Sequence, residues 1–291
     1  MAKRKRQTTQ AVIEKRLKEG RGQGTGVTYK PWLTIQDVSS NGICKRIKGL
    51  TTERRHEFLS RLEVHYFYIL DWSPVVEDIR EQYPLLPLSE TLEVAEQLGI
   101  RHPTDSKTQE PIVMTTDFYI AIRQDMGVSY QARTVKPSGE LENERTIEKF
   151  EIERQFWLKR NISWGIVTER EIPPILGENI DWISGRFDEE NLSLSERELL
   201  QAKKLLLQWI AKRDDPLTEI TADCDDKLGL EPGDSLSVVR HMLARRELLV
   251  DLNQPINPRK KLVLLNSLSV DLINQREKLD EPFCQPATLL A

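Results

Sequence analysis

The order of hydrophobic patterns between residues 52 and 168 is the feature that most limits what this chain can fold into. Apolar residues at helical spacing alternate there with short β-branched and aromatic runs that are typical of strands. The pattern predicts helices over 52–72, 89–100 (with Ser89 as its N-cap) and 140–160, and strands over 75–86, 112–122, 131–137 and 162–168, with 123–130 connecting the middle two strands. Helices interspersed with strands in this way indicate an α/β fold in which helices cover a mixed sheet.

Beyond residue 170 the pattern becomes mainly helical. Residues 171–179 contain two prolines and a glycine and are expected to form a linker. Helices are predicted over 194–213, 217–230 and 234–249, the first opened by a capping box near Ser193 or Ser195, and a β-hairpin with strands 248–252 and 261–265 follows. Helix, helix, turn, helix and hairpin is the order of a winged-helix domain.

A chain of 291 residues is long enough for two domains of ordinary size. The boundaries predicted from the pattern are a flexible basic arm over 1–26, a mixed α/β domain over 27–170, a helical domain over 171–277 and a tail over 278–291, either disordered or a docking peptide. No apolar stretch reaches 18 residues, so a membrane-spanning helix is not expected. The three cysteines lie far apart and the N-terminus does not resemble a secretory signal, which together favour a cytoplasmic location.

The charge is distributed unevenly. Residues 1–26 contain eight Lys and Arg against two Glu, whereas residues 171–291 contain 15 basic and 22 acidic residues. The basic arm is compatible with phosphate contact and equally with a solvated tail. The helical half has one locally basic stretch, 232–266, whose candidates for DNA or partner contact are Arg240, Arg245, Arg246, Lys260 and Lys261. Because phosphate affinity depends on clustered positive charge, the acidic surroundings favour a protein partner over DNA.

One spacing carries possible chemistry. Asp117 lies in the strand 112–122, while Thr134 and Lys136 lie in the strand 131–137 and share one face, with Val135 on the other. A carboxylate on one strand and a lysine two residues after a polar position on its neighbour is the core pattern of metal-dependent nucleases. There the carboxylate and a main-chain carbonyl hold Mg²⁺, and the lysine stabilises charge that develops on the phosphate. Taken alone the pattern is weak, because Lys136 also fits an ordinary exposed strand end.

Glu63 lies within the apolar stripe of the helix over 52–72, which is formed by Leu59, Leu62, Tyr66 and Leu70. A carboxylate in such a stripe must be paired, bound to a metal or placed at the edge of the stripe. Two interpretations follow. Glu63 either faces the sheet and joins Asp117, or is an edge residue in a salt bridge with an arginine.

Several runs of residues, in the right order and over most of the chain, resemble the TnsA endonuclease subunits of heteromeric bacterial transposases. The most specific are GRGQG at 20–24, PWLTIQDV at 31–38, EDIREQYPLLP at 77–87, TTDF at 115–118, VKP at 135–137, ERTIEKFEIERQFW at 144–157 and ENIDW at 178–182. The resemblance implies a restriction-endonuclease-like PD-(D/E)xK domain followed by a winged-helix-like domain. It implies an Mg²⁺-dependent endodeoxyribonuclease that nicks the 5′ ends of a transposon, with Glu63, Asp117 and Lys136 as catalytic residues.

The resemblance also implies ligands and partners. The metal, Mg²⁺ with Mn²⁺ as a substitute, would be held by Glu63, Asp117 and the Val135 carbonyl. Thr134 departs from the family pattern, which has an acidic residue or Gln there, so it is a weaker ligand; Gln82 is either near the metal or an ordinary polar residue at a strand end. The implied partners are transposon-end DNA, a DDE transposase (TnsB) and an ATPase regulator (TnsC), with no membrane.

Two alternatives stay open at this point. A restriction-type nuclease outside transposition would cut its own site unaided, and an inactive winged-helix scaffold would assemble without cutting. The nuclease interpretation predicts weak or no cleavage by the isolated chain and activity with its partner.

Overall fold

The computed structural model describes residues 7–38, 44–184 and 192–265. The chain divides into two compact units, of which the first ends at Ile172 and the second begins at Pro173. Among the described residues, no helix is both long enough and apolar enough to cross a membrane.

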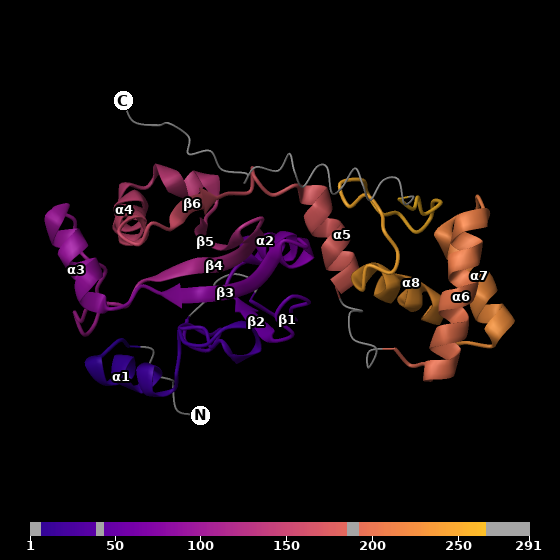
Figure 1. The fold of residues 1–291 in the computed structure, drawn as a ribbon, viewed down its shortest axis with the longest axis horizontal. Helices are drawn as coiled ribbons and strands as arrows, with labels where there is room; N and C mark the ends of the chain where they lie inside the picture. The colour runs from indigo at the N-terminus through magenta and orange to yellow at the C-terminus, as the bar shows by residue number, and fades with distance from the viewer. Residues whose placement is uncertain (1–6, 39–43, 185–191, 266–291) are drawn as a thin grey trace. The chain divides into compact units, whose positions relative to one another are not determined.

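The first unit is built on a four-stranded sheet of order β3–β4–β5–β6 (Figure 1). Its strands are β3 (Val76–Pro84), β4 (Thr115–Gln124), β5 (Gly127–Val135) and β6 (Ser163–Val167). The first two pairings are antiparallel and the β5–β6 pairing is parallel. The helices of this part are α2 (Arg61–Trp72), α3 (Leu88–Gln97) and α4 (Glu144–Leu158), with the 3₁₀ turn η2 (Ser138–Glu142) before α4. The expected mixed α/β sheet is therefore confirmed.

Helices α2 and α4 cover opposite faces of this sheet. The ring of Phe118 in β4 contacts Tyr66 of α2, with 5.2 Å between ring centroids. The next residue, Tyr119, stacks on Trp157 of α4 at 5.1 Å. Because successive residues of a strand point to opposite faces, one helix lies on each face.

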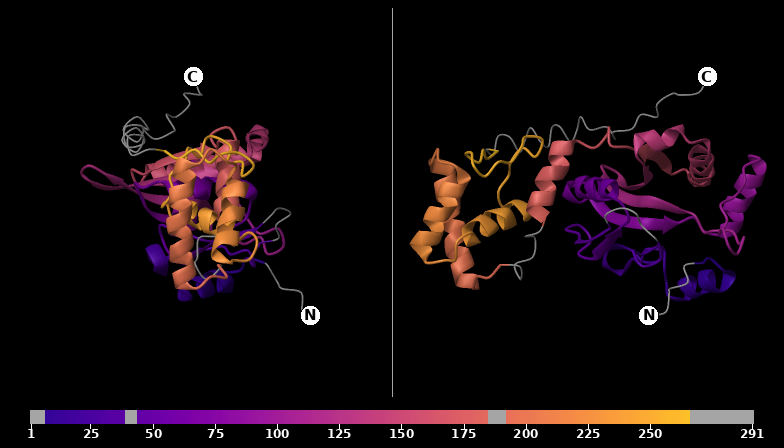
Figure 2. Two further views of the ribbon diagram at one scale, coloured as in Figure 1. Left: turned by 90° about the vertical axis from the view of Figure 1, so that its right-hand side faces the viewer. Right: turned by 180° about the vertical axis from the view of Figure 1, so that it is seen from behind.

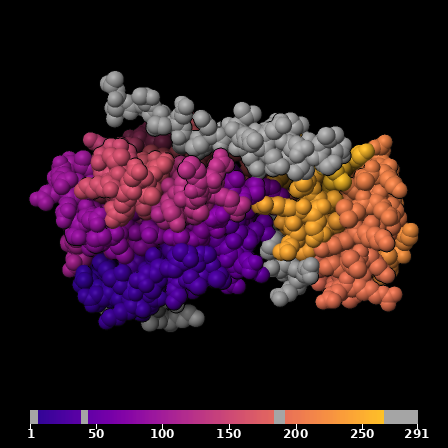
Figure 3. All heavy atoms as spheres, viewed as in Figure 1, coloured from indigo at the N-terminus to yellow at the C-terminus, as the bar shows by residue number. Residues whose placement is uncertain are grey.

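The N-terminal segment forms a layer on the surface of the first unit (Figure 3). It contains α1 (Gln10–Lys18) and the 3₁₀ turn η1 (Gly26–Thr28). Ile13 and Trp32 are buried in one cluster with Val113, which lies just before β4. Within residues 7–26, the buried side chain of Ile13 anchors α1, so this part of the expected flexible arm contains a packed helix. Residues 1–6 lie outside the described residues.

The helix predicted over 52–72 is shorter than expected. Residues Arg55–Phe58 form β2, which pairs antiparallel with β1 (Lys45–Lys48). Helix α2 starts only after Ser60, whose hydroxyl accepts a hydrogen bond from the Glu63 amide at 3.1 Å. Pairing with β1, a tertiary contact, overrides the helical spacing of the first part, and the serine N-cap sets the true start.

Smaller differences concern element ends in the first unit. Strand β4 ends later than predicted and β5 begins earlier, so residues 125–126 alone connect them. Helix α3 begins at Leu88 with Pro87, not Ser89, in the N-cap position. On α4, Phe150 and Trp157 are buried, whereas Ile147 and Leu158 are exposed. Leu141 lies in η2, before that helix begins. Thr146, Ile152, Glu153 and Phe156 are also buried on α4.

The second unit is helical, with α5 (Pro174–Ser184), α6 (Glu196–Lys212), α7 (Leu217–Leu228) and α8 (Asp234–Ala244). Helices α6, α7 and α8 pack against one another (Figure 2). The capping box predicted for α6 is present between Ser195 and Glu198. The three helices predicted beyond residue 193 are therefore confirmed.

Two predictions for the second unit are wrong. The segment 171–179 is not a linker, because α5 begins at Pro174, and proline fits the first turn of a helix, where no amide donor is needed. The described residues 248–265 contain no strand, although the Leu265 amide bonds to the Leu249 carbonyl. Backbone carbonyls of Pro258 and Lys260 instead accept from the first amides of α7, which places this segment over the start of that helix. The tail, 278–291, lies outside the described residues.

Candidate active site

In strands β3 and β4, the regular alternation of side chains between the two faces of the sheet is interrupted at one position. Cross-strand pairing of Glu81 with Phe118 and of Tyr83 with Thr116 places Gln82 directly opposite Asp117, and we name this pair the 82–117 rung. On one side of the rung, Glu81 bonds to β2 and the segment before it, and Phe118 contacts α2. On the other side, Tyr83 and Thr116 contact α4. Residues two apart in a regular strand share a face, so the backbone turns over at this rung.

Asp117 lies where β5 separates from β4. Backbone pairing of these strands ends at Phe118 and Arg133, and the Asp117 carboxylate occupies the next position. One oxygen, Oδ2, accepts from the Val135 amide at 2.8 Å, and Oδ1 accepts from the Gln82 side-chain amide at 3.0 Å. Burial raises the pKa of Asp117, while these two hydrogen bonds and the charge of Lys136 lower it. The carboxylate is therefore held in one orientation at the open end of a strand pair.

Glu63 brings a second carboxylate to the same place. It lies in the first turn of α2, is buried, and its Oε2 accepts from the Leu59 amide at 3.0 Å. Burial, followed by the negative charge of Asp117, raises the pKa of Glu63 to about 8, and the charge of Lys136 opposes this. The carboxylate of Glu63 is buried, and the charge of Asp117 raises its pKa, which favours the interpretation that Glu63 faces the sheet over that of an edge residue paired with arginine.

Lys136 follows directly after β5. Its Nζ lies 3.1 Å from Oε2 of Glu140, and its positive charge lowers the pKa of both Glu63 and Asp117. The structure thus brings the two carboxylates and the lysine within electrostatic range of one another. Val135, between Thr134 and Lys136, donates its amide to Asp117.

Thr134 is turned toward α4. Its side chain is buried, and the hydroxyl donates to Oε1 of Glu153. Gln82 is also buried, and both ends of its amide are used, toward Asp117 and toward the Thr115 hydroxyl. Both side chains are thus engaged in hydrogen bonds within the protein.

Glu153 is a buried carboxylate that the sequence analysis did not single out. Its Oε1 accepts from Thr116 at 2.6 Å, from Thr134, and from the Trp164 indole at 2.9 Å. Burial raises its pKa to about 7 despite these bonds, and the charge of Asp117 adds to the rise. One signal was available: Glu153 lies three residues after Phe150 and four before Trp157, on the buried face of the helix.

A second buried carboxylate, Glu81, also escaped the sequence analysis. Arg54 forms a two-fold ion pair with it, and Nδ1 of His56 lies 2.8 Å from its Oε2. Although burial raises the pKa of Glu81, His56 and Arg54 outweigh it and lower the value to about 2. This fully paired group fixes β2 against β3.

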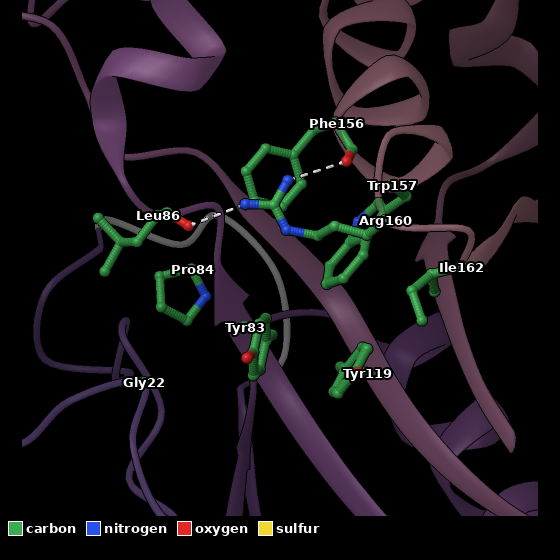
Figure 4. Close-up of a pocket in the computed structure, with 9 residues that line it drawn as sticks. All are labelled: Gly22, Tyr83, Pro84, Leu86, Tyr119, Phe156, Trp157, Arg160 and Ile162. Atoms are coloured by element: carbon green, nitrogen blue, oxygen red, sulfur yellow. Dashed lines mark hydrogen bonds between the residues drawn. The ribbon is translucent and has the colours of Figure 1, made fainter.

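A cavity of about 330 Å³ lies on the α4 face of the sheet (Figure 4). Its lining includes Tyr83, Tyr119, Trp157 and Arg160. The Arg160 guanidinium donates to the carbonyls of Phe156 and Leu86 and pairs with Glu90 at 2.7 Å. Because Glu63 approaches from the α2 face, this cavity is separate from the carboxylate site.

The basic candidates of the second unit have mixed surroundings. Arg240 donates to the Trp182 carbonyl and its guanidinium lies 5.2 Å from the centre of that ring. Lys261 pairs with Asp214. Arg245 and Lys260 are exposed, and Arg246 is partly buried. At least two of the five positive charges are thus used in contacts within the unit.

The donor set limits what the site could bind. In the described ranges, no group of three or more His, Cys, Asp or Glu could hold a metal ion. The site offers two carboxylates and main-chain oxygens. Mg²⁺ is commonly bound by one or two carboxylates, with waters and substrate phosphates completing its shell, so the donor set suits that ion.

Comparisons with known proteins identify the family of the chain. A family model described as "TnsA-like endonuclease N terminal" matches residues 73–169, and one described as "TnsA endonuclease C terminal" matches residues 171–252. The Escherichia coli protein "Transposon Tn7 transposition protein TnsA" is 40% identical over 244 residues, covering 84% of this chain and 87% of the relative. The chain therefore belongs to the TnsA endonuclease family.

Proposed function

We propose that the chain is the Mg²⁺-dependent endonuclease subunit of a transposase and nicks the 5′ ends of the transposon. It would act with transposon-end DNA, a DDE transposase (TnsB) and an ATPase regulator (TnsC). The observation that carries the proposal is the pairing of Glu63 and Asp117, whose mutual repulsion a divalent cation relieves. The 40% identity to a transposition protein supports this setting.

The first unit supports a PD-(D/E)xK organisation. We infer that Glu63, Asp117 and the Val135 carbonyl hold Mg²⁺, or Mn²⁺ in its place. Bound there, the ion would polarise the scissile phosphate and favour ionisation of the attacking water. The Lys136 ammonium, already within range of both carboxylates, would stabilise the charge that builds up on the phosphate.

We assign no metal-ligand role to Thr134, because its side chain is turned toward α4, where its hydroxyl donates to Glu153. A single ion held by two carboxylates therefore fits this site better than two ions. The hydrogen bond from the Val135 amide ties the Asp117 carboxylate to the end of β5. Preorganised ligands of this kind reduce the rearrangement that catalysis requires.

For the second unit we propose contact with a partner protein in preference to duplex DNA. Arg240 and Lys261 are already paired within the unit, and residues 171–291 are acidic overall. Affinity for phosphates rests on unpaired, clustered positive charge. End recognition would then come mainly from the partner transposase.

The proposal is tested by strand-specific nicking of a transposon-end duplex in the presence of the partner transposase. Wild type should nick the 5′ strand when Mg²⁺ is present and stop when it is chelated, and Asp117→Ala and Lys136→Ala should lower the rate at least 100-fold. The exposed residues Asp125 and Lys159, changed to Ala, serve as matched controls. Nicking that survives chelation, or that the Asp117 variant retains, contradicts the proposal, and efficient specific nicking by the isolated chain contradicts its dependence on a partner.

A further inference from the structure

Gln82 has a backbone conformation that strands rarely contain. Its φ is +48° within β3, at the rung where both strands change faces. Glycine adopts positive φ freely, whereas a long side chain such as glutamine pays a conformational cost there. A strained residue persists only where its surroundings hold it, and such residues concentrate at functional sites.

The side chain of Gln82 is directed at Asp117. Its Nε2 donates to Oδ1 of Asp117 at 3.0 Å, and its Oε1 accepts from the Thr115 hydroxyl at 3.0 Å. An ionised carboxylate only accepts hydrogen bonds, so the amide must present its NH₂ group to Asp117. With the Val135 amide on the other oxygen, Asp117 is held from both sides.

The N-terminal segment holds the backbone of Gln82 in place. The Gln82 carbonyl accepts from the Trp32 amide at 3.1 Å, and the preceding Glu81 carbonyl accepts from the Tyr29 hydroxyl at 3.1 Å. On the other side, a Cβ at Gly22 would lie 2.3 Å from Pro84, so this glycine permits the close approach of the segment to the end of β3. These contacts oppose relaxation of the strained residue.

We propose that Gln82 is a positioning residue, which orients the Asp117 carboxylate for metal binding and is held in its strained conformation by residues 22–32. This inference rests on the proposed function, because it presupposes the role of Asp117. In this role Gln82 acts through Asp117, because its amide is directed to Asp117 and to the Thr115 hydroxyl.

Two substitutions distinguish the contribution of the Gln82 side chain from that of its backbone conformation. Gln82→Gly accepts the positive φ without strain but removes the amide, whereas Gln82→Met keeps the approximate size and removes both hydrogen bonds. We expect both to lower the 5′-nicking rate at saturating DNA at least tenfold in the complex with the partner transposase, with KM for DNA unchanged. A role limited to backbone shape predicts full activity for Gln82→Gly.

A second readout does not depend on catalysis. Mn²⁺ binding should raise the midpoint of thermal unfolding of the wild-type chain, because a ligand stabilises the state that it binds. We expect a smaller rise in Gln82→Gly and Gln82→Met, and none in Asp117→Ala. If one Gln82 variant does not fold, the other carries both measurements.

The outcomes are distinguishable. Wild-type nicking rate and Mn²⁺ response in Gln82→Gly, with Asp117→Ala inactive, would overturn the positioning role and leave the proposed function intact. Wild-type nicking by Asp117→Ala would overturn both. Loss of nicking with a raised KM and an unchanged Mn²⁺ response would indicate a DNA contact and also contradict the proposal.

Discussion

At the scale of single residues, the site is defined by carboxylates whose environments differ. Glu63 and Glu153 are buried with raised pKa values, whereas Glu81 is buried with a lowered pKa, because His56 and Arg54 face it. Asp117 was predicted from its strand spacing with Thr134 and Lys136, whereas the apolar stripe left Glu63 between two interpretations and only the resemblance to the family implied its place in the site. Glu153 could not be assigned in this way, because its three donors come from β4, β5 and β6, which only the folded chain brings together.

The pKa of Glu153 makes stability depend on pH. Its raised value, about 7 against 4.5, means that between these pH values only the folded state keeps the proton, so stability falls as pH rises. We expect the contribution of this residue to the free energy of unfolding to fall by about 3 kcal/mol across that window. All three donors bond to Oε1, so Glu153→Gln can keep these bonds without titrating. Urea unfolding at pH 5 and pH 8 should show less loss in this variant than in wild type, and equal losses would disprove the assignment.

At the scale of elements, helices and strands were predicted correctly where the sequence contains a helix cap or a clear hydrophobic periodicity. The capping box at Ser195 and the strands around Asp117 are examples. The errors arose where distant contacts decide. Pairing with β1 turns residues 55–58 into a strand, and contacts with the start of α7 occupy residues 258–260, where a hairpin was predicted. A single sequence does not reveal such pairings. The two prolines of 171–179 indicate a linker, yet Pro174 is the first residue of α5.

The start of α2 gives a prediction for an element. The Ser60 hydroxyl caps the helix by accepting from the Glu63 amide. Ser60→Ala removes this bond and should lower the free energy of unfolding by about 1 kcal/mol. Ser60→Asn, which can also cap, should lie close to wild type in the same denaturant titration. Equal stability of the Ala variant and wild type would show that the cap does not set the start of this helix.

At the scale of the whole molecule, the two units have different proposed roles. The first unit supplies the carboxylates and the lysine, and the second supplies a helical surface with mainly acidic surroundings. The mixed α/β character of the first and the helical character of the second followed from hydrophobic periodicity alone. The interrupted alternation of side chains at the 82–117 rung could not be predicted, because it depends on the positive φ of Gln82, and no sequence pattern indicates a positive φ at a glutamine.

The central claim is that Glu63 and Asp117 act as one metal centre, and a double-mutant comparison of 5′-strand nicking in the complex with the partner transposase tests it most directly. If both hold the same ion, Glu63→Ala and Asp117→Ala should each remove nearly all nicking, and the double variant should be no slower than either single one. Asp125→Ala should nick like wild type. Substantial nicking by either single variant, or losses that multiply in the double variant, would contradict the account.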